Sequence, residues 1–278
     1  MVDAITPNQS ELGKKSIYSP HYNPDKLLAI PRQVKRDEIG ITQPLPFYGL
    51  DIWNHYEVSW LNQKGKPVIA IAEIIYGCNT PYIIESKSMK LYFNSFNHSK
   101  FKNIQEVEKT IKEDITRTVH GPVRVKLLSL AHTKILPRLS NFKGVCLDDL
   151  DIHCDTYLVD HTFLKTENKN VKETFYSHLL KSNCLVTHQP DWGSIQIKYQ
   201  GRKINREGLL RYLVSYRNHN EFHEQCIERI FMDIMRICKP KSLAVYGRYT
   251  RRGGIDINPF RTTSKNFRAV KQIRLYRQ

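Results

Sequence analysis

The chain has 278 residues, with 43 basic and 27 acidic side chains and a formal net charge of +16 at pH 7. This length is enough for one large core or two ordinary ones without disulfide cross-links, and the charge favours an anionic partner such as nucleic acid, a phosphorylated cofactor or an acidic surface. Residues 1–16 are polar and lack the apolar segment of a secretory signal, and no later stretch approaches the length of a membrane span, so a soluble cytoplasmic protein is expected.

The cysteines show no metal-binding spacing. No two of them form a C-x-x-C pair, and none pairs with histidines at zinc-finger spacing. We therefore expect no metal site and free thiols in a reducing compartment. The six are Cys78, Cys146, Cys154, Cys184, Cys226 and Cys238.

Residues 1–46 contain several prolines and little periodicity, which predicts an irregular arm. Apolar or alternating runs at 52–61 and 68–76 then predict two strands. The connection between them, Asn-Gln-Lys-Gly-Lys-Pro, has the composition of a hairpin turn.

Two helices are expected next. The first covers about residues 85–96, and the second has Asn103 as its N-cap and Glu106 closing a capping box. A strand at 123–130 follows, with a partner strand expected within 144–154. The inward helical positions are Met89, Tyr92, Phe93, Phe96, Ile104, Val107, Ile111 and Ile115.

The second half repeats this order. Strands at about 174–186 and 194–199 precede a helix at about 206–217 and a longer helix at about 221–238, which Pro240 stops. Two more strands, at about 243–249 and 255–260, flank an Arg-Arg-Gly-Gly turn.

Each half thus has the order strand-strand-helix-helix-strand-strand. This order predicts an α+β fold of antiparallel sheets, each with two helices packed on one face. A tandem duplication is the economical explanation, with an N-terminal arm at 1–46, one ββααββ module at 47–160 and a second at 161–278. Residues far apart in number can then share one site between the modules.

The stretch 183–192, Asn-Cys-Leu-Val-Thr-His-Gln-Pro-Asp-Trp, holds the strongest candidate for chemistry. Cys184 supplies a nucleophilic thiol, and Asp191, seven residues later, can carry a proton, so the pair suffices for addition to an electrophilic carbon. On this stretch alone, a buried structural cysteine followed by a Pro-Asp turn explains the pattern as well.

Two helix starts carry further polar groups. The run 85–93, Glu-Ser-Lys-Ser-Met-Lys-Leu-Tyr-Phe, offers a carboxylate, hydroxyls and free amides that could grip a polar ring or a phosphate. His223 and Glu224 open the long second-half helix, where a histidine can titrate near neutrality. Ordinary amphipathic helices with favourable first turns are the alternative explanation for both.

The last part of the chain is strongly basic. Residues 241–278 contain ten basic side chains and one acidic side chain, Asp256. A solvated basic tail, RNA contact and a phosphate clamp at Arg251–Gly254 all remain possible. The G-x-G-x-x-G fingerprint is absent, so any dinucleotide site here is not of the Rossmann type.

Taken together, these residues resemble the long, two-module form of the NADPH-dependent 7-cyano-7-deazaguanine reductases, the nitrile reductases of queuosine biosynthesis. Residues 85–92 fit that family's E-S-K-S-h-K-L-Y signature at every position, h being apolar. Cys184 with Asp191, His223-Glu224 and Arg252-Gly253 fall where the family has its other site residues, and the resemblance extends over essentially the whole chain.

The resemblance implies tandem tunnelling-fold modules that assemble into a homodimer or larger oligomer. It implies that Cys184 attacks the nitrile carbon to form a covalent thioimide, with Asp191 as proton donor and His223 assisting, and that NADPH reduces this adduct to 7-aminomethyl-7-deazaguanine. It also assigns binding residues. For the substrate these are Ile84, Glu85, Ser86, His223 and Glu224, and for NADPH they are Ser86, Lys87, Arg252 and Gly253.

Two alternatives remain at this stage. Another tunnelling-fold purine or pterin enzyme, such as a cyclohydrolase, would need a zinc-binding Cys/His set, which the spacing does not suggest. A basic RNA-binding module would explain the charge, but it leaves the Cys, Asp and His-Glu pattern without a role. Direct nucleic-acid binding is therefore not expected.

Overall fold

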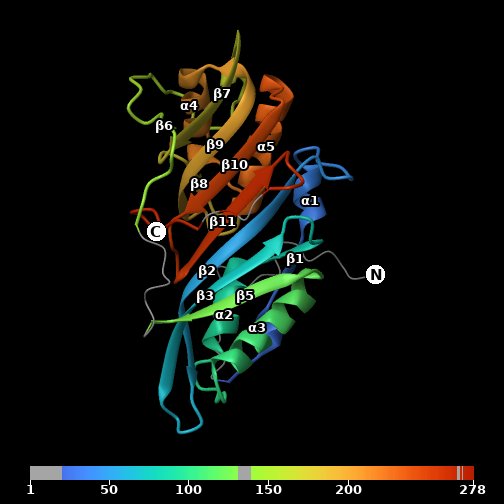
Figure 1. The fold of residues 1–278 in the computed structure, drawn as a ribbon, viewed down its shortest axis with the longest axis vertical. Coiled ribbons are helices and arrows are strands. Elements are labelled where there is room, and N and C mark those ends of the chain that lie inside the picture. The colour runs from blue at the N-terminus through green and yellow to red at the C-terminus, as the bar shows by residue number, and fades with distance from the viewer. Residues whose placement is uncertain (1–20, 131–138, 268–269, 271) are drawn as a thin grey trace. The chain divides into compact units, whose positions relative to one another are not determined.

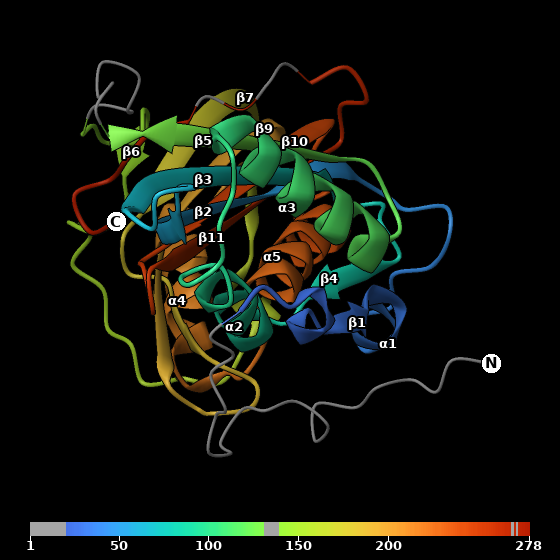
Figure 2. The same ribbon diagram turned by 90° about the horizontal axis from the view of Figure 1, so that it is seen from below.

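The computed structural model describes all residues except 1–20, 131–138, 268–269 and 271 (Figures 1 and 2). As far as they are described, the residues divide into two compact units. Unit 1 comprises Met1–Glu38, Asp51–Leu136 and Arg251–Asp256, and unit 2 comprises Ile39–Leu50, Pro137–Thr250 and Ile257–Gln278. Both units mix helices with antiparallel strands, as predicted for an α+β protein.

Unit 1 contains three long strands in the order β5-β3-β2: β2 (Tyr48–Leu61), β3 (Pro67–Gly77) and β5 (Val123–Ser129). The predicted hairpin connection between β2 and β3 is confirmed. Asn62 closes it by donating its backbone N–H to the carbonyl of Lys66 and by accepting from the N–H groups of Lys64 and Lys66.

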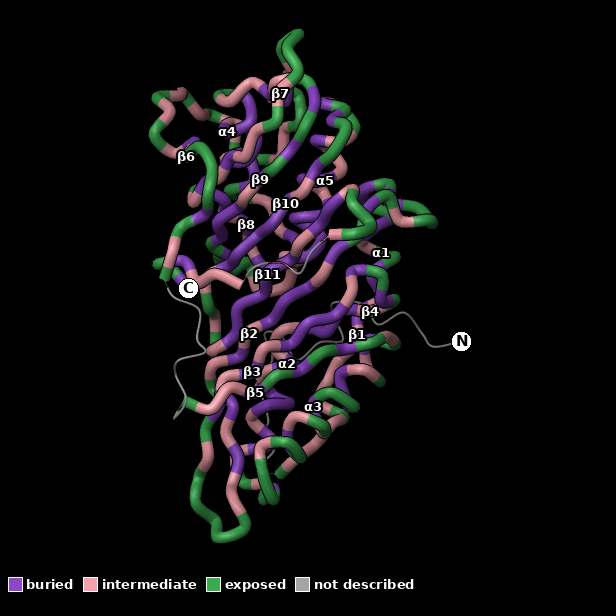
Figure 3. Tube along the Cα trace, viewed as in Figure 1, coloured by how far each residue is buried: buried purple, intermediate pink, exposed green. Residues whose placement is uncertain are grey.

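Helices α2 (Ser86–Asn94) and α3 (Ile104–Val119) follow β3 and the short strand β4 (Tyr82–Ile84). The N-cap of α3 is confirmed, because Asn103 accepts from the Glu106 N–H at 2.9 Å. The reciprocal half of the predicted capping box differs, since Glu106 accepts from the N–H of Lys102 at 2.6 Å and not from that of Asn103. The apolar stripe of α3 is buried (Figure 3). The helix lies alongside β5 and β3 in Figure 2. The stripe consists of Val107, Ile111, Ile115 and Val119.

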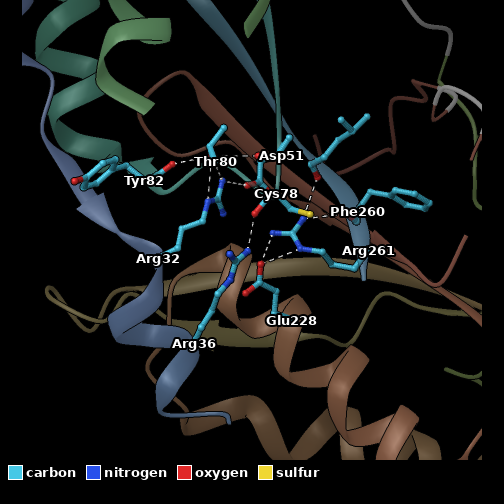
Figure 4. A network of polar contacts seen from close by, with 11 residues as sticks. Arg32, Arg36, Asp51, Cys78, Thr80, Tyr82, Glu228, Phe260 and Arg261 are labelled. Atoms are coloured by element: carbon cyan, nitrogen blue, oxygen red, sulfur yellow. Dashed lines mark hydrogen bonds and ion pairs between the residues drawn. The ribbon is translucent and has the colours of Figure 1, made fainter. Parts of the chain in front are cut away.

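The described part of the predicted arm is more regular than its prolines suggest; residues 1–20 lie outside the described residues. Strand β1 (Ala29–Pro31) pairs antiparallel with β4, and helix α1 (Arg32–Asp37) follows it directly. The buried Arg32 side chain stabilises the regular structure of this segment. Its guanidinium bonds the Asp51 carboxylate at 2.5 Å and the Thr80 hydroxyl (Figure 4). A buried charge is stable only when paired in this way.

The segment before β1 runs along α2. Its backbone N–H groups donate to serine hydroxyls, from Tyr22 to Ser99 at 2.7 Å and from Leu28 to Ser88 at 3.0 Å. The phenols of Tyr22 and Tyr92 both donate to Oδ2 of Asp114 on α3, each at 2.7 Å. Burial and this carboxylate raise the pKa of both tyrosines, so the segment, α2 and α3 share one polar anchor.

Unit 2 has the strand order β11-β10-β9-β7-β6. At its centre, Ile197 of β9 pairs with Phe175 on one side and with Val245 on the other. The short strand β8 pairs with the beginning of β9. The strands are β6 (Val145–Cys146), β7 (Thr166–Ser177), β8 (Lys181–Asn183), β9 (Pro190–Ile204), β10 (Ser242–Tyr249) and β11 (Ile255–Thr262).

Two strand predictions were wrong. Residues 144–154 supply only the two-residue β6, which pairs parallel with β7 of the second half. The expected single strand at 174–186 is divided, because β7 ends at Ser177 and β8 begins at Lys181. Its apolar residues Leu179 and Leu180 fall in the break between these strands.

Helices α4 (Arg206–Val214) and α5 (His223–Cys238) agree with the prediction, except that residues 215–218 form a 3-10 turn after α4. Arg261 of β11 is fully buried and bonds Glu228 of α5 through Nε at 3.0 Å and Nη2 at 2.8 Å (Figure 4). These two charge-assisted hydrogen bonds connect β11 to α5, the helix that begins with His223. Among the described residues, no helix is long and apolar enough to cross a membrane.

Candidate active site

A tight hairpin carries Cys184 at the start of its turn and Asp191 near the start of its second strand. In the β8–β9 pairing, Asn183 stands opposite Pro190, and Ser182 stands opposite Asp191. Cys184 opens the turn, since its N–H donates to the Gln189 carbonyl at 2.8 Å and its carbonyl accepts from the His188 N–H at 3.0 Å. The spacing of seven residues is therefore that of one hairpin, with the thiol and the carboxylate at its two ends.

The same hairpin is joined to the start of α5. Asn183 donates its N–H to the His219 carbonyl at 2.8 Å and accepts from the Glu221 N–H at 3.1 Å, in the segment that leads directly into the helix. His223, in the first turn of α5, has Nε2 at 3.6 Å from Oδ2 of Asp191. Unit 2 thus gathers the predicted thiol, acid and imidazole.

Packing on both sides of the hairpin holds the Asp191–His223 pair. The Tyr249 ring lies 4.0 Å from the His223 ring, centroid to centroid, and Asp191 is only 6 % exposed. Lys181 lies at the other side, where burial lowers the pKa of its amine, Arg217 lowers it further, and the Asp191 charge opposes the shift. The Asp191 carboxylate therefore lies largely buried, close to the His223 ring and within electrostatic reach of Lys181.

Glu224 follows His223 in the first turn of α5 and is 4 % exposed. A carboxylate there is stabilised by the positive end of the helix dipole. Glu85, the second predicted carboxylate, belongs to unit 1 and is the N-cap of α2. It accepts from the N–H groups of Lys87 at 2.8 Å and Ser88 at 2.7 Å.

The strand and helix around Glu85 set its ionisation. Ile84 ends β4 and is buried, and the Glu85 N–H donates to the Leu28 carbonyl at 2.9 Å. Burial raises the pKa of the Glu85 carboxyl, while the two capping N–H groups and the charge of Lys90 oppose the rise. Additional hydrogen-bond donors would stabilise the charged form of this carboxylate.

A cavity of about 380 Å³ lies in unit 1 beside the predicted cofactor residues Lys87 and Gly253. Its lining comes from strand β2, helix α2 and the basic turn. The lining residues are His55, Glu57, Lys87, Lys90, Leu91, Asn94, Asn97 and Gly253. Residues separated by about two hundred positions in sequence therefore line one cavity.

Both glycines of the basic turn are required by its geometry. Gly253 and Gly254 have φ values of 59° and 74°, and Arg252 and Ile255 exchange backbone hydrogen bonds across them, as in a tight two-residue hairpin turn. A Cβ on Gly253 would lie 2.9 Å from the Lys90 side chain, and one on Gly254 would lie 2.4 Å from Glu57. The absence of side chains lets the turn lie against the cavity.

The sequence analysis gave no role to His55, which is buried against Phe93 at 4.3 Å between ring centroids. Its Nδ1 accepts from the Glu57 N–H at 3.1 Å, which leaves the ring proton on Nε2 in the neutral form. Burial, with the charge of Lys90, lowers the pKa of this imidazole to about 3. The available signal was one histidine within the predicted strand at 52–61.

Within the described ranges, no group of three histidine, cysteine or carboxylate side chains is arranged to hold a metal ion. The described cysteines are all free thiols.

Two family models match this chain. The model described as "Nitrile reductase, 7-cyano-7-deazaguanine-reductase N-term" matches residues 18–127, which include the run from Glu85 to Tyr92. The model described as "QueF-like protein" matches residues 190–267, which include Asp191, His223 and Arg252.

Curated relatives match nearly end to end, and each is named NADPH-dependent 7-cyano-7-deazaguanine reductase. The protein of Legionella pneumophila (strain Lens) is 58 % identical over 272 residues, 98 % of this chain and 95 % of the relative. That of Cupriavidus metallidurans is 55 % identical over 260 residues, 92 % and 94 % of the two chains. That of Dechloromonas aromatica is 54 % identical over 270 residues, 95 % of each. With the site geometry, these matches establish that the chain belongs to the NADPH-dependent 7-cyano-7-deazaguanine reductase family.

Proposed function

We propose that this protein reduces the nitrile of 7-cyano-7-deazaguanine to the primary amine of 7-aminomethyl-7-deazaguanine with NADPH, in queuosine biosynthesis. The observation that carries the proposal is the β8–β9 hairpin, which holds Cys184 and Asp191 at its two ends and is bonded to the segment before His223. A thiol and an acid on one hairpin, with an imidazole 3.6 Å from the acid, fit addition to a polarised carbon–nitrogen triple bond.

Cys184 is the proposed nucleophile. Its thiolate adds to the nitrile carbon, a carbon–sulfur bond forms, one carbon–nitrogen π bond breaks, and the nitrogen takes up a proton to give a thioimide. The thiol is buried, so it must lose its proton inside the site. Positive charge beside the thiol would favour the thiolate, and Lys181 lies three residues before Cys184 with its ammonium bonded to the Asn183 side-chain oxygen at 2.6 Å.

Asp191 and His223 are the proposed proton carriers. At 3.6 Å the two groups are just beyond direct hydrogen-bond distance, and a small closure on substrate binding would join them. Asp191 then delivers a proton to the substrate nitrogen, and His223 restores the proton on Asp191 between steps.

Glu85 and Glu224 are the proposed grips on the deazaguanine ring, with Ile84, Ser86 and His223 completing the contacts. Carboxylates suit the N1–H and 2-amino donors of a guanine-like edge. A donor left unpaired costs ~1–3 kcal/mol, which selects against adenine-like rings. The raised pKa of Glu85 supports this role, because incoming donors stabilise its charged form.

The cavity in unit 1 fits a phosphorylated cofactor. Lys87 and Lys90 supply positive charge, Arg252 lies in the turn beside it, and Gly253 presents bare backbone. Ser86, Lys87, Arg252 and Gly253 are the proposed contacts to NADPH. When bound, NADPH supplies hydride, and the conversion of a nitrile to an amine requires two such transfers.

The proposed architecture is that of tandem tunnelling-fold modules at 47–160 and 161–278, preceded by an arm at 1–46. The strand-helix-helix-strand order of β2, β3, α2, α3 and β5, and of β7, β9, α4, α5, β10 and β11, supports it. Closure of such sheets into barrels favours a homodimer or larger assembly, and the expected location is the cytoplasm.

The test is to mix the protein with the nitrile in the absence of NADPH and measure the intact mass. A covalent adduct is expected on wild-type protein and on Cys154→Ala, a matched loss of a thiol elsewhere in unit 2. Cys184→Ala should form no adduct and should show only trace reduction. Normal turnover by Cys184→Ala would refute the mechanism. Salt-sensitive RNA binding without any adduct would instead favour the RNA-binding alternative.

A further inference from the structure

The segment ending in Arg277 and Gln278 is bonded to β9, which carries Asp191, and to β10, whose Tyr249 ring packs against His223. All of these residues lie in unit 2. Neither Arg277 nor Gln278 has a role in the proposed reaction. Arg277 nevertheless contacts the backbone two residues after Asp191, and Gln278 contacts the backbone of Tyr249, whose ring packs on His223.

Gln278 uses its whole side-chain amide. Oε1 accepts from Arg248 Nε at 2.5 Å and from the Leu275 N–H at 3.3 Å, and Nε2 donates to the Tyr249 carbonyl at 3.0 Å and to Asn258 Oδ1 at 2.9 Å. A primary amide has two donor hydrogens and two acceptor lone pairs, so all are occupied. The residue is 5 % exposed, so water does not replace these partners.

Arg277 is bonded to the start of β9. Its guanidinium donates to the carbonyls of Gly193 at 3.3 Å and His178 at 2.9 Å, and it lies 6.0 Å from the centroid of the Trp192 ring. Trp192 and Gly193 directly follow Asp191. Arg277 therefore fixes the backbone two residues beyond the proposed acid.

The two attachments meet at one rung of the sheet. Gly193 pairs with Tyr249 in the β9–β10 register, and a Cβ on Gly193 would lie 3.2 Å from the Tyr249 ring. That ring packs 4.0 Å from the His223 ring. Gln278 holds the Tyr249 backbone, and Arg277 holds the Gly193 backbone, so together they fix both sides of the rung.

We propose that Arg277 and Gln278 are positioning residues, which set the distance between Asp191 and His223 by fastening Gly193 and Tyr249. This inference rests on the proposed function of the Asp191–His223 pair. Proton transfer depends steeply on geometry, whereas the ring grips and the phosphate contacts lie on other residues. Loss of the attachment should therefore lower kcat and leave the KM values for nitrile and NADPH nearly unchanged.

Gln278→Glu is the sharpest variant. It keeps the shape but turns a carboxylate oxygen toward the Tyr249 carbonyl, where two acceptors repel. Gln272→Glu is the matched control. Within the described part of the chain, Gln272 accepts from the same Arg248 guanidinium, at 3.2 Å from Nη1, and makes no bond to Tyr249 or Asn258. Arg277→Lys is a second, milder variant, which keeps the charge but loses the planar donor pair.

The experiment measures kcat, both KM values and the pH profile of kcat, with rates divided by the number of sites that form the nitrile adduct. Gln278→Glu should lower kcat roughly tenfold or more and change its pH profile, and Arg277→Lys should do so to a smaller extent. Gln272→Glu should keep the wild-type kcat and the wild-type pH profile. The idea is overturned if Gln278→Glu keeps the wild-type kcat and pH profile, or if Gln272→Glu loses as much.

A spectroscopic readout separates this inference from the proposed function. The ring protons of His223 lie in the ring current of Tyr249, so their NMR resonances should move in Gln278→Glu and stay in place in Gln272→Glu. If wild-type protein fails to reduce the nitrile while these resonances respond as expected, the function is refuted and the positioning is upheld. Unmoved resonances in Gln278→Glu would refute the positioning whatever the activity.

Discussion

Nε2 of His223 lies 3.6 Å from Oδ2 of Asp191, and the two residues come from elements thirty-two positions apart in sequence. The start of β9 supplies the carboxylate and the first turn of α5 supplies the imidazole. The proposed proton transfer depends on this pairing.

Asp191→Asn should slow nitrile reduction by about 10²-fold or more, since the amide keeps the shape but has no transferable proton. Adduct formation and the reduction that follows should be measured separately by rapid mixing. An unchanged steady-state rate at neutral pH would remove Asp191 from the mechanism.

Glu224→Gln should weaken nitrile binding by roughly 5- to 150-fold, equivalent to about 1–3 kcal/mol, because the amide can present a donor toward the donor edge of the ring. The first turn of α5 should persist, since Glu224 is not its N-cap. Calorimetric titration of nitrile into Cys184→Ala, with and without Glu224→Gln, avoids covalent capture. Equal affinities would contradict the role of Glu224.

Arg252→Ala should raise the KM for NADPH by about 10- to 150-fold, a loss of roughly 1.5–3 kcal/mol for a charge-assisted contact to phosphate. The nitrile adduct should form normally, because covalent capture needs no cofactor. Arg251→Ala is the matched control. That arginine stacks over Tyr56 at 4.3 Å and is not among the proposed contacts. An RNA-binding module would instead lose RNA affinity in Arg252→Ala, with no change in the NADPH KM.

His55 should make the folded state less stable in mild acid. Its pKa is about 3 in the fold and 6.5 in an unfolded chain, so below pH 6.5 the unfolded state binds a proton that the folded state does not. The free energy of unfolding should therefore fall as the pH falls, by about 1.5–2 kcal/mol from this group between pH 6.5 and 5.

Urea unfolding of His55→Leu across this pH range tests the claim. The variant should lose that part of the acid dependence, whereas His153→Gln, a change at an exposed histidine in unit 2, should keep the wild-type slope. An identical acid slope in wild type and His55→Leu would contradict it.

Local sequence patterns predicted the parts of the fold that local physics determines. Asn103 as N-cap specified the start of α3, and the helical spacing of Val107, Ile111 and Ile115 specified its buried face. The residues joining β2 to β3 likewise specified their hairpin. In each case, the partners lie within a few positions of one another.

Long-range pairing was harder to predict. The apolar approach through Leu179 and Leu180 was interpreted as part of one long strand. In the structure the chain breaks there, because β7 and β8 pair with different parts of β9. The cavity that joins Lys90 to Gly253 depends on residues from distant parts of the chain. Spacing alone carried no information about that contact, nor about the burial of His55.

One carboxylate oxygen of Asp114 accepts from both Tyr22 and Tyr92, so the segment around Tyr22, helix α2 and helix α3 should become ordered together. If the segment around Tyr22 detaches, a buried carboxylate loses one of its two phenol donors, and the serine hydroxyls along α2 lose their backbone partners at the same time. Opening of this segment and loosening of the helix that presents Glu85 should then occur together. Amide hydrogen exchange at residues 22–28 would therefore report, without any ligand, how often the end of α2 that Glu85 caps becomes disordered.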